Sequence, residues 1–81
     1  SSVSNLHGVD AEIIEFVVKG DSKVTKAPIK DLKFPKTSNI AGVIRDGLPI
    51  IPFGNFQLME NDKTVVFSLT ESIKEIEKFF Q

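Results

Sequence analysis

Residues 38–52 read Ser-Asn-Ile-Ala-Gly-Val-Ile-Arg-Asp-Gly-Leu-Pro-Ile-Ile-Pro, and this stretch decides the fold. Two apolar runs, 40–44 and 48–51, are rich in β-branched residues and flank an Asp-Gly dipeptide. Asp-Gly between such runs is a strong signal for a tight β-hairpin turn, because Asp46 and Gly47 both tolerate the positive φ that the turn requires. The stretch is therefore expected to form an antiparallel hairpin.

Three further residues constrain this hairpin. Proline lacks an N–H, so Pro49 is expected on a sheet edge and Pro52 is expected to end the second strand. Gly42, inside the first strand, indicates either a β-bulge or a place where a ligand or another backbone comes close.

Length and composition indicate one small domain and argue against several classes of function. The 81 residues are 41% hydrophobic and 26% charged, with a net charge of -1. Such a balance and a single arginine, Arg45, argue against nucleic-acid binding. The absence of cysteine and the presence of one histidine exclude thiolate chemistry and a metal site built on His or Cys. No apolar run is long enough to insert into a bilayer, so a cytoplasmic location is expected.

Flanking segments extend the hairpin into a sheet. Residues 1–10 are small and polar and are expected to be a partly disordered leader or linker, leaving 11–81 as the domain. Residues 11–19 and 64–69 alternate as strands do, although neither face of 11–19 is cleanly polar. The turn-rich connection between the hairpin and the last strand carries Phe56 and Leu58, which are expected to enter the core.

Two helices are expected, one on each side of the hairpin. Residues 27–32 predict a helix of one to two turns with Pro28 at its first position. Thr70 or Ser72 is expected to cap a C-terminal helix. The apolar residues of this second helix recur at helical spacing; they are Ile73, Ile76, Phe79 and Phe80. The sum predicts the α+β class: a small, mostly antiparallel sheet of about four strands with a short helix and a C-terminal helix on one face.

No catalytic constellation is apparent. His7 lies in the leader, where a solvated histidine is expected, and Glu12 and Glu15 fall on opposite faces of a strand, so they are no acid/base pair. Residues 60–62, Glu-Asn-Asp, could hold Ca²⁺ but lack the spacing of an EF-hand, so a turn with Asn61 in the left-handed region is favoured. The chain is expected to be a binding or assembly module and not an enzyme. Apolar strand faces and Phe79-Phe80 are expected to need cover from an oligomer interface.

Several short motifs, in order, resemble the C-terminal regulatory domain of the Trk potassium-uptake protein TrkA, the RCK-C or TrkA-C module. The resemblance covers nearly the whole chain after residue 5. The matching motifs are Leu6-His7-Gly8, 11–18, 22–25, 28–32, Ile40-Ala41-Gly42-Val43-Ile44-Arg45-Asp46-Gly47, Ile50-Ile51-Pro52 and 62–67, with Asn61 where the family commonly has Gly.

The resemblance implies a cytosolic subunit, peripheral to the inner face of the membrane, that controls potassium uptake through a Trk-type transporter. NAD or ATP would bind only in a separate Rossmann domain, because this chain lacks the Gly-x-Gly-x-x-Gly turn. This module would form a homodimer through its strand edge and terminal helix. It would also sense a small-molecule effector such as cyclic di-AMP.

The resemblance also implies which residues an effector would contact. They are Ile29, Lys30, Asn39, Ile40 and Pro52. Pro35 stands where relatives use a basic residue for the nucleotide's phosphates, which argues against cyclic di-AMP as the effector. Two alternatives remain: regulation of a different channel or transporter, and a purely structural dimerisation module without ligand.

Overall fold

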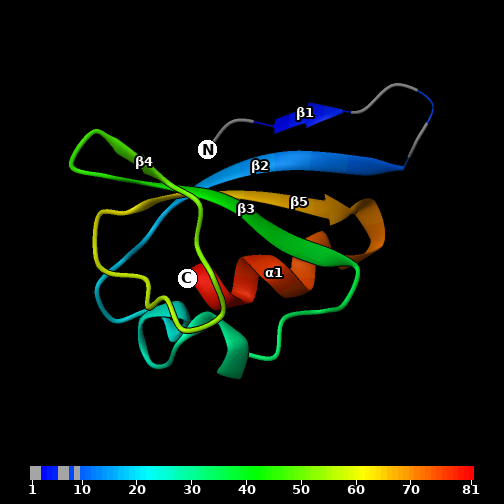
Figure 1. Ribbon diagram of the computed structural model, residues 1–81. Coiled ribbons are helices and arrows are strands. Elements are labelled where there is room, and N and C mark those ends of the chain that lie inside the picture. Colours follow the sequence, from blue (N-terminus) through cyan, green and yellow to red (C-terminus); the bar gives the residue numbers. More distant parts are fainter. Residues whose placement is uncertain (1–2, 6–7, 9) are drawn as a thin grey trace.

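The computed structural model describes residues 3–5, 8 and 10–81. Over this part of the chain, an antiparallel sheet of five strands in the order β1-β2-β5-β3-β4 lies over a single α-helix (Figure 1). The α+β class is confirmed, with β1 added to the expected strands. The strands are β1 Val3–Asn5, β2 Ala11–Val17, β3 Ser38–Arg45, β4 Leu48–Ile50 and β5 Lys63–Leu69; the helical elements are the 3-10 turns η1 Lys23–Thr25, η2 Ile29–Asp31 and η3 Thr70–Ser72, and the α-helix α1 Ile73–Phe80.

The predicted hairpin is confirmed as β3 and β4. Asp46 and Gly47 have φ values of 52° and 79°, the left-handed pair that joins tightly paired strands. Pro49 lies on β4, the edge strand of the sheet, where its missing N–H leaves no ladder bond unmade. Pro52 lies two residues beyond the end of β4, so the second strand is shorter than expected.

Gly42 marks a β-bulge. The register of β3 against β5 shifts between Ile40 and Gly42. A Cβ added at Gly42 would meet the Ile50 carbonyl oxygen at 3.8 Å, which is ordinary van der Waals contact. Of the two interpretations of this glycine, the bulge is the one that the structure confirms.

The core lies between one face of the sheet and α1. Phe80 stacks on Phe16 of β2 with ring centroids 4.3 Å apart, and Phe79 meets the edge of Phe34 at 4.7 Å. Both helix phenylalanines are buried, at 9% and 4% exposure. The expectation that they need an oligomer partner is therefore wrong: Phe34, from the segment before β3, covers them within the monomer. Phe56 and Leu58 join this core as expected.

The short helix before β3 is a 3-10 turn, η2, and not an α-helix of one to two turns. Pro28 precedes it at the N-cap position. Lys33 has a φ of 58°, so the backbone enters the left-handed region directly after Leu32 and the turn cannot continue. The sequence signal at Pro28 located this element but not its type.

The two ends of the domain differ from expectation. Val3–Asn5 pairs with β2 as strand β1, whereas a linker was expected; His7 lies outside the described residues. Ser72 occupies the N-cap position of α1 but makes no capping hydrogen bond. Its backbone is already helical because η3 precedes it, and its hydroxyl hydrogen-bonds to that of Thr37 instead.

Candidate functional site

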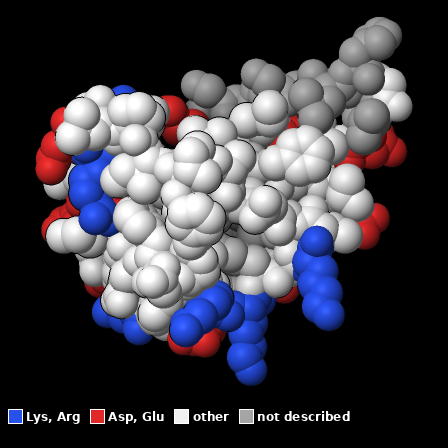
Figure 2. All heavy atoms as spheres, in the orientation of Figure 1, with Lys and Arg blue, Asp and Glu red and all other residues white. Residues whose placement is uncertain are grey.

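One border of the sheet exposes large apolar side chains within six residues of chain. Leu48, Ile51 and Phe53 are 67%, 72% and 77% exposed. We call the outer side of β3 and β4, with residues 51–54 and η2, the edge surface. Figure 2 shows that the molecule is largely uncharged over this region, with lysines along its lower border. No local feature of the sequence marks these three residues as exposed, since exposure depends on where the chain runs after β4.

Backbone polar groups add to this surface. β4 pairs only with residues 43–45 of β3, so among the described residues the outer edge of β3 from Ser38 to Gly42 has no neighbouring strand. The Ser38 N–H donates to the Pro35 carbonyl, which satisfies one group at this edge. Pro52 has no N–H to offer the edge of β3. An unpaired strand edge beside apolar side chains is a template for pairing with another chain.

Hydrogen bonds attach η2 to the segment that follows Pro52. The Ile29 N–H donates to the Phe56 carbonyl at 2.9 Å and the Lys30 N–H to the Gly54 carbonyl at 2.8 Å. A Cβ at Gly54 would lie 3.2 Å from the Lys30 Cβ, so the absence of a side chain permits this close passage. The structure therefore brings Ile29 and Lys30 beside the chain that leaves Pro52.

The resemblance also implies Asn39 and Ile40 as effector contacts, and these two residues differ in exposure. Asn39 is exposed, whereas Ile40 is 7% exposed and belongs to the core. They alternate along β3 and point to opposite faces of the sheet. Ile40 can therefore present backbone groups to a partner, but its side chain is already used within the monomer.

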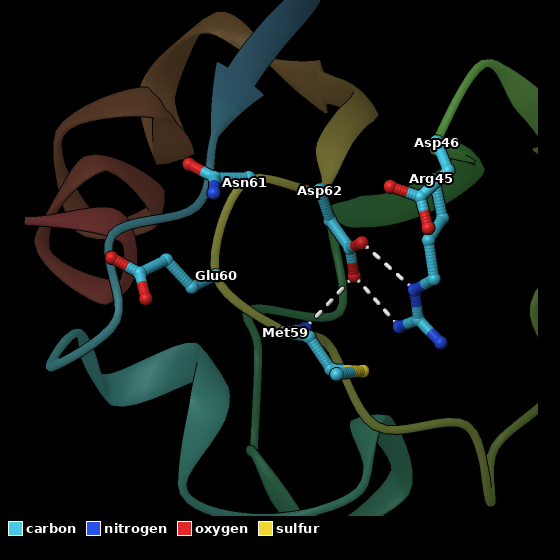
Figure 3. Close-up of a pocket in the computed structure, with 6 residues that line it drawn as sticks. All are labelled: Arg45, Asp46, Met59, Glu60, Asn61 and Asp62. Carbon is cyan, nitrogen blue, oxygen red and sulfur yellow. Dashed lines mark hydrogen bonds and ion pairs between the residues drawn. The ribbon is translucent and has the colours of Figure 1, made fainter.

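An ion pair joins the turn end of the β3–β4 hairpin to the loop before β5 (Figure 3). Arg45 donates from Nε to Asp62 Oδ1 at 2.9 Å and from Nη2 to Oδ2 at 2.8 Å. The Met59 N–H also donates to Oδ2, at 2.8 Å. The guanidinium further donates to the Gln57 carbonyl at 3.1 Å and lies 4.7 Å from the centroid of the Phe56 ring. Arg45 thus holds the segment from Phe56 to Asp62 against β3.

The pKa values of Arg45 and Asp62 are both shifted in the direction that keeps the ion pair charged. Burial disfavours the Asp62 carboxylate, but the hydrogen bonds from Arg45 and the Met59 N–H outweigh it and hold its pKa below the ordinary value. The hydrogen bond to Asp62 raises the pKa of Arg45. Both groups are therefore charged at neutral pH.

The same geometry decides between the two interpretations of residues 60–62. Asn61 has a φ of 73°, so the left-handed turn is confirmed. The Asp62 oxygens are occupied by Arg45 and Met59, and Glu60 points away from them in Figure 3. Within the described residues no three His, Cys, Asp or Glu side chains gather in a way that would hold a metal ion. The small pocket here, of about 170 Å³, is lined by residues 45, 46 and 59–62.

Comparison with protein families matches residues 13–81 to the TrkA-C domain model. The chain belongs to the TrkA-C domain family. Two similar proteins are a Trk system potassium uptake protein TrkA homolog 2 from Methanosarcina mazei and a Trk system potassium uptake protein TrkA from Azorhizobium caulinodans. The first is 35% identical over 99% of this chain and the second 30% identical over 86%. The matched regions cover only 18% and 15% of those proteins.

A solved structure shares the fold of this TrkA-C domain. It is described as an RCK domain with cda, is 20% identical in sequence, and superposes with a TM-score of 0.73 over 85% of this chain and 97% of that chain. The described part of the TrkA-C chain contains no helix with the length and hydropathy needed to cross a membrane.

Proposed function

We propose that this TrkA-C domain is the regulatory and dimerisation part of a cytosolic subunit that controls potassium uptake through a Trk-type membrane transporter. Membership of the TrkA-C family and the similarity to two potassium uptake proteins support the proposal. The whole subunit would lie at the inner face of the membrane, and NAD or ATP would bind in a Rossmann domain elsewhere in it. Its role is control and not catalysis.

The edge surface is the observation that carries the dimerisation proposal. Three exposed apolar side chains flank the bare backbone of β3, so a second copy would both bury Leu48, Ile51 and Phe53 and satisfy the edge. The terminal helix is left out of this interface, because its phenylalanines are already buried. The dimer would therefore form through the strand edge alone.

Sedimentation velocity over a range of concentrations tests this dimer. Phe53→Ser removes a ring that is 77% exposed, so it should weaken the dimer without unfolding the monomer. Met59→Ser is the matched control, because Met59 is 55% exposed outside the edge surface. A wild-type chain whose association is unaffected by Phe53→Ser would contradict the proposal.

We further propose that an effector binds beside this interface, at Ile29, Lys30, Asn39, Ile40 and Pro52. The hydrogen bonds between η2 and residues 54–56 support the grouping of Ile29 and Lys30 with Pro52. A ligand at a dimer interface can regulate only through unequal affinity for two dimer arrangements, and the coupling is reciprocal.

A thermal-shift panel of nucleotides, cyclic dinucleotides and Ca²⁺ tests the effector. A ligand that binds only the native domain raises its Tm. Lys30→Ala and Asn39→Ala both alter exposed side chains, so they should abolish the shift at unchanged basal Tm. A flat panel would contradict effector binding and favour the alternative, a purely structural dimerisation module. Pro35, which supplies no charge for a phosphate, already favours that alternative over cyclic di-AMP.

A further inference from the structure

The charges of this domain are unevenly distributed along the chain. Residues 19–36, which lie between β2 and β3 and include η1 and η2, hold six of the ten basic residues and two of the eleven acidic ones. This segment therefore carries a net charge of +4 and the rest of the chain -5, although the whole chain is close to neutral. Its six basic residues are exposed lysines, which we call the basic side: Lys19, Lys23, Lys26, Lys30, Lys33 and Lys36.

The fold places the basic side along one border of the molecule. In Figure 1 the segment runs beneath the sheet and α1, and Figure 2 shows lysine side chains projecting from this lower border. Lys23 is held against the core, with its Nζ 5.1 Å from the centroid of the Phe79 ring. Among the described residues the one ion pair joins Arg45 to Asp62, so the basic side has no ion-pair partner there. Its positive charge is therefore available to an external anion.

The backbone of Lys33 gives a second observation. Its φ is 58°, in the left-handed region, which glycine and asparagine adopt at lower cost than lysine does. A residue held in a sparsely populated conformation is a marker of function. Lys33 is exposed, so packing in the core does not explain a lysine at this position. Its charge is the property that does.

The form of the basic side indicates which anion it fits. A small phosphate ligand needs donors that converge in a concave site. The pocket beside Arg45 and Asp62 includes none of these lysines, and a hollow of about 400 Å³ beside Phe16 and Phe80 includes only Lys19. The basic side is therefore suited to an extended anionic surface.

Residue type distinguishes between extended anions. Nucleic acids and protein interfaces favour arginine, whose planar guanidinium binds phosphate or carboxylate at two points. Every cation of the basic side is instead a lysine, a hydrated point charge on a flexible stem. A cluster of about four to eight cations beside a membrane is attracted to anionic lipid. We propose that the basic side docks on the anionic headgroups of a phospholipid bilayer.

This inference rests on the proposed location of the subunit at the inner face of the membrane. It adds a direct contact between this domain and lipid headgroups, made by charge and without insertion. The uneven charge also sets the orientation, because the acidic remainder of the chain turns away from an anionic surface. Each lysine near the surface strengthens binding about fivefold, so binding by one domain should be weak and should fall as salt is raised.

Sedimentation with sucrose-loaded vesicles measures this binding. The domain should bind vesicles that contain phosphatidylglycerol and should not bind vesicles of phosphatidylcholine alone. The triple variant Lys26→Gln/Lys33→Gln/Lys36→Gln should bind about a hundredfold more weakly. These three lysines lie outside the edge surface and outside the proposed effector contacts, so the variant leaves both unchanged.

The chain offers a control with the same net charge. Lys63→Gln/Lys74→Gln/Lys78→Gln removes three exposed lysines that lie outside the basic side, and it should weaken binding by less than about threefold at 0.1 M salt, where distant charges are screened. Equal losses in the two triple variants would show that net charge alone drives adsorption, and would overturn the proposal.

A single substitution separates lipid binding from folding. Lys33→Asn removes the charge and places in the left-handed region a residue that tolerates it. It should lower vesicle affinity about fivefold and raise Tm by roughly 2–5 °C. A lower Tm together with weaker binding would assign Lys33 to the fold and contradict the role proposed for its charge.

Two competitors identify the source of the anion. Inorganic phosphate should displace the domain from vesicles no better than chloride at equal ionic strength, and duplex DNA should bind more weakly than the vesicles. Displacement by phosphate, tighter binding to DNA, or a wild-type chain that does not sediment with phosphatidylglycerol would overturn the proposal. None of these results would contradict the regulatory role or the edge dimer, since the dimer is measured without lipid and a transporter can hold the subunit at the membrane.

Discussion

Asp62 shows how much one residue can decide in a domain of this size. It is 2% exposed, and its two oxygens receive three hydrogen bonds, two from Arg45 and one from the Met59 N–H. The turn at Asn61 is predictable from local chemistry, because asparagine tolerates the left-handed region. The partner of Asp62 has no local signal, because Arg45 is 17 residues away, at the end of β3.

Asp62→Asn should destabilise the domain by about 1–3 kcal/mol at neutral pH, since it leaves the buried part of the Arg45 contact uncompensated. Asp46→Asn is the control: it removes the same charge from an exposed left-handed turn position and should change stability by less than about 0.5 kcal/mol. Urea denaturation of the three proteins measures the difference. Equal stability of both variants would contradict the structural role of the ion pair.

The same pair predicts a dependence on pH. Because the pKa of folded Asp62 is below its unfolded value of about 3.9, the ionised carboxylate stabilises the fold above that value. This contribution is lost as the pH falls through the folded pKa. The stability difference between wild type and Asp62→Asn should therefore be constant from pH 5 to 7, values chosen roughly to lie above both pKa values, and shrink below about pH 4. A difference that grows toward acid pH would contradict this assignment.

Two glycines of the hairpin should respond differently to alanine. Gly47 has a φ of 79°, so Gly47→Ala places a Cβ in the left-handed region and should cost about 1–2 kcal/mol. Gly42→Ala adds a Cβ at ordinary contact distance from Ile50 and should change stability by less than about 0.5 kcal/mol. Thermal denaturation ranks the two, and the reverse order would show that the bulge and not the turn requires glycine.

At the scale of elements, α1 is held by Ile76 and by the two phenylalanines of its last turn. Phe80 stacks on Phe16 with an interplanar angle of 5°, and both Phe79 and Phe80 contact Phe34. Helical spacing was enough to predict α1. The type of η2 was not predictable, because the left-handed Lys33 that ends it follows from how the chain must turn into β3.

Phe80→Ala should cost about 3–5 kcal/mol, because it removes a buried ring and leaves a cavity beneath β2. Phe53→Ala removes the same side chain from a position that is 77% exposed, and it should change monomer stability by less than about 0.5 kcal/mol. Denaturant titration at low protein concentration compares them. Similar losses in both would show that the edge surface is part of the monomer fold.

At the scale of the whole molecule, α1 covers one face of the sheet, and among the described residues a stretch of the outer edge of β3 has no neighbouring strand. A dimer couples folding to protein concentration, so the Tm of the wild-type chain should rise as the chain is concentrated. Phe53→Ser should flatten this dependence, and Met59→Ser should not. Differential scanning calorimetry over a hundredfold range, about as wide as the method allows, makes the comparison. A Tm independent of concentration in the wild type would contradict association of the native domain.

By itself, the sequence determined the elements with local signatures: the Asp46-Gly47 turn, the alternating strands, the spacing of α1 and the motifs of the TrkA-C family. These depend on neighbours along the chain. Only the tertiary structure decided that Phe79 and Phe80 are covered within the monomer, that Arg45 holds Asp62, and that the lysines of the basic side lie along one border of the domain. Such features depend on which distant segments become neighbours, and the packing of the whole domain sets that.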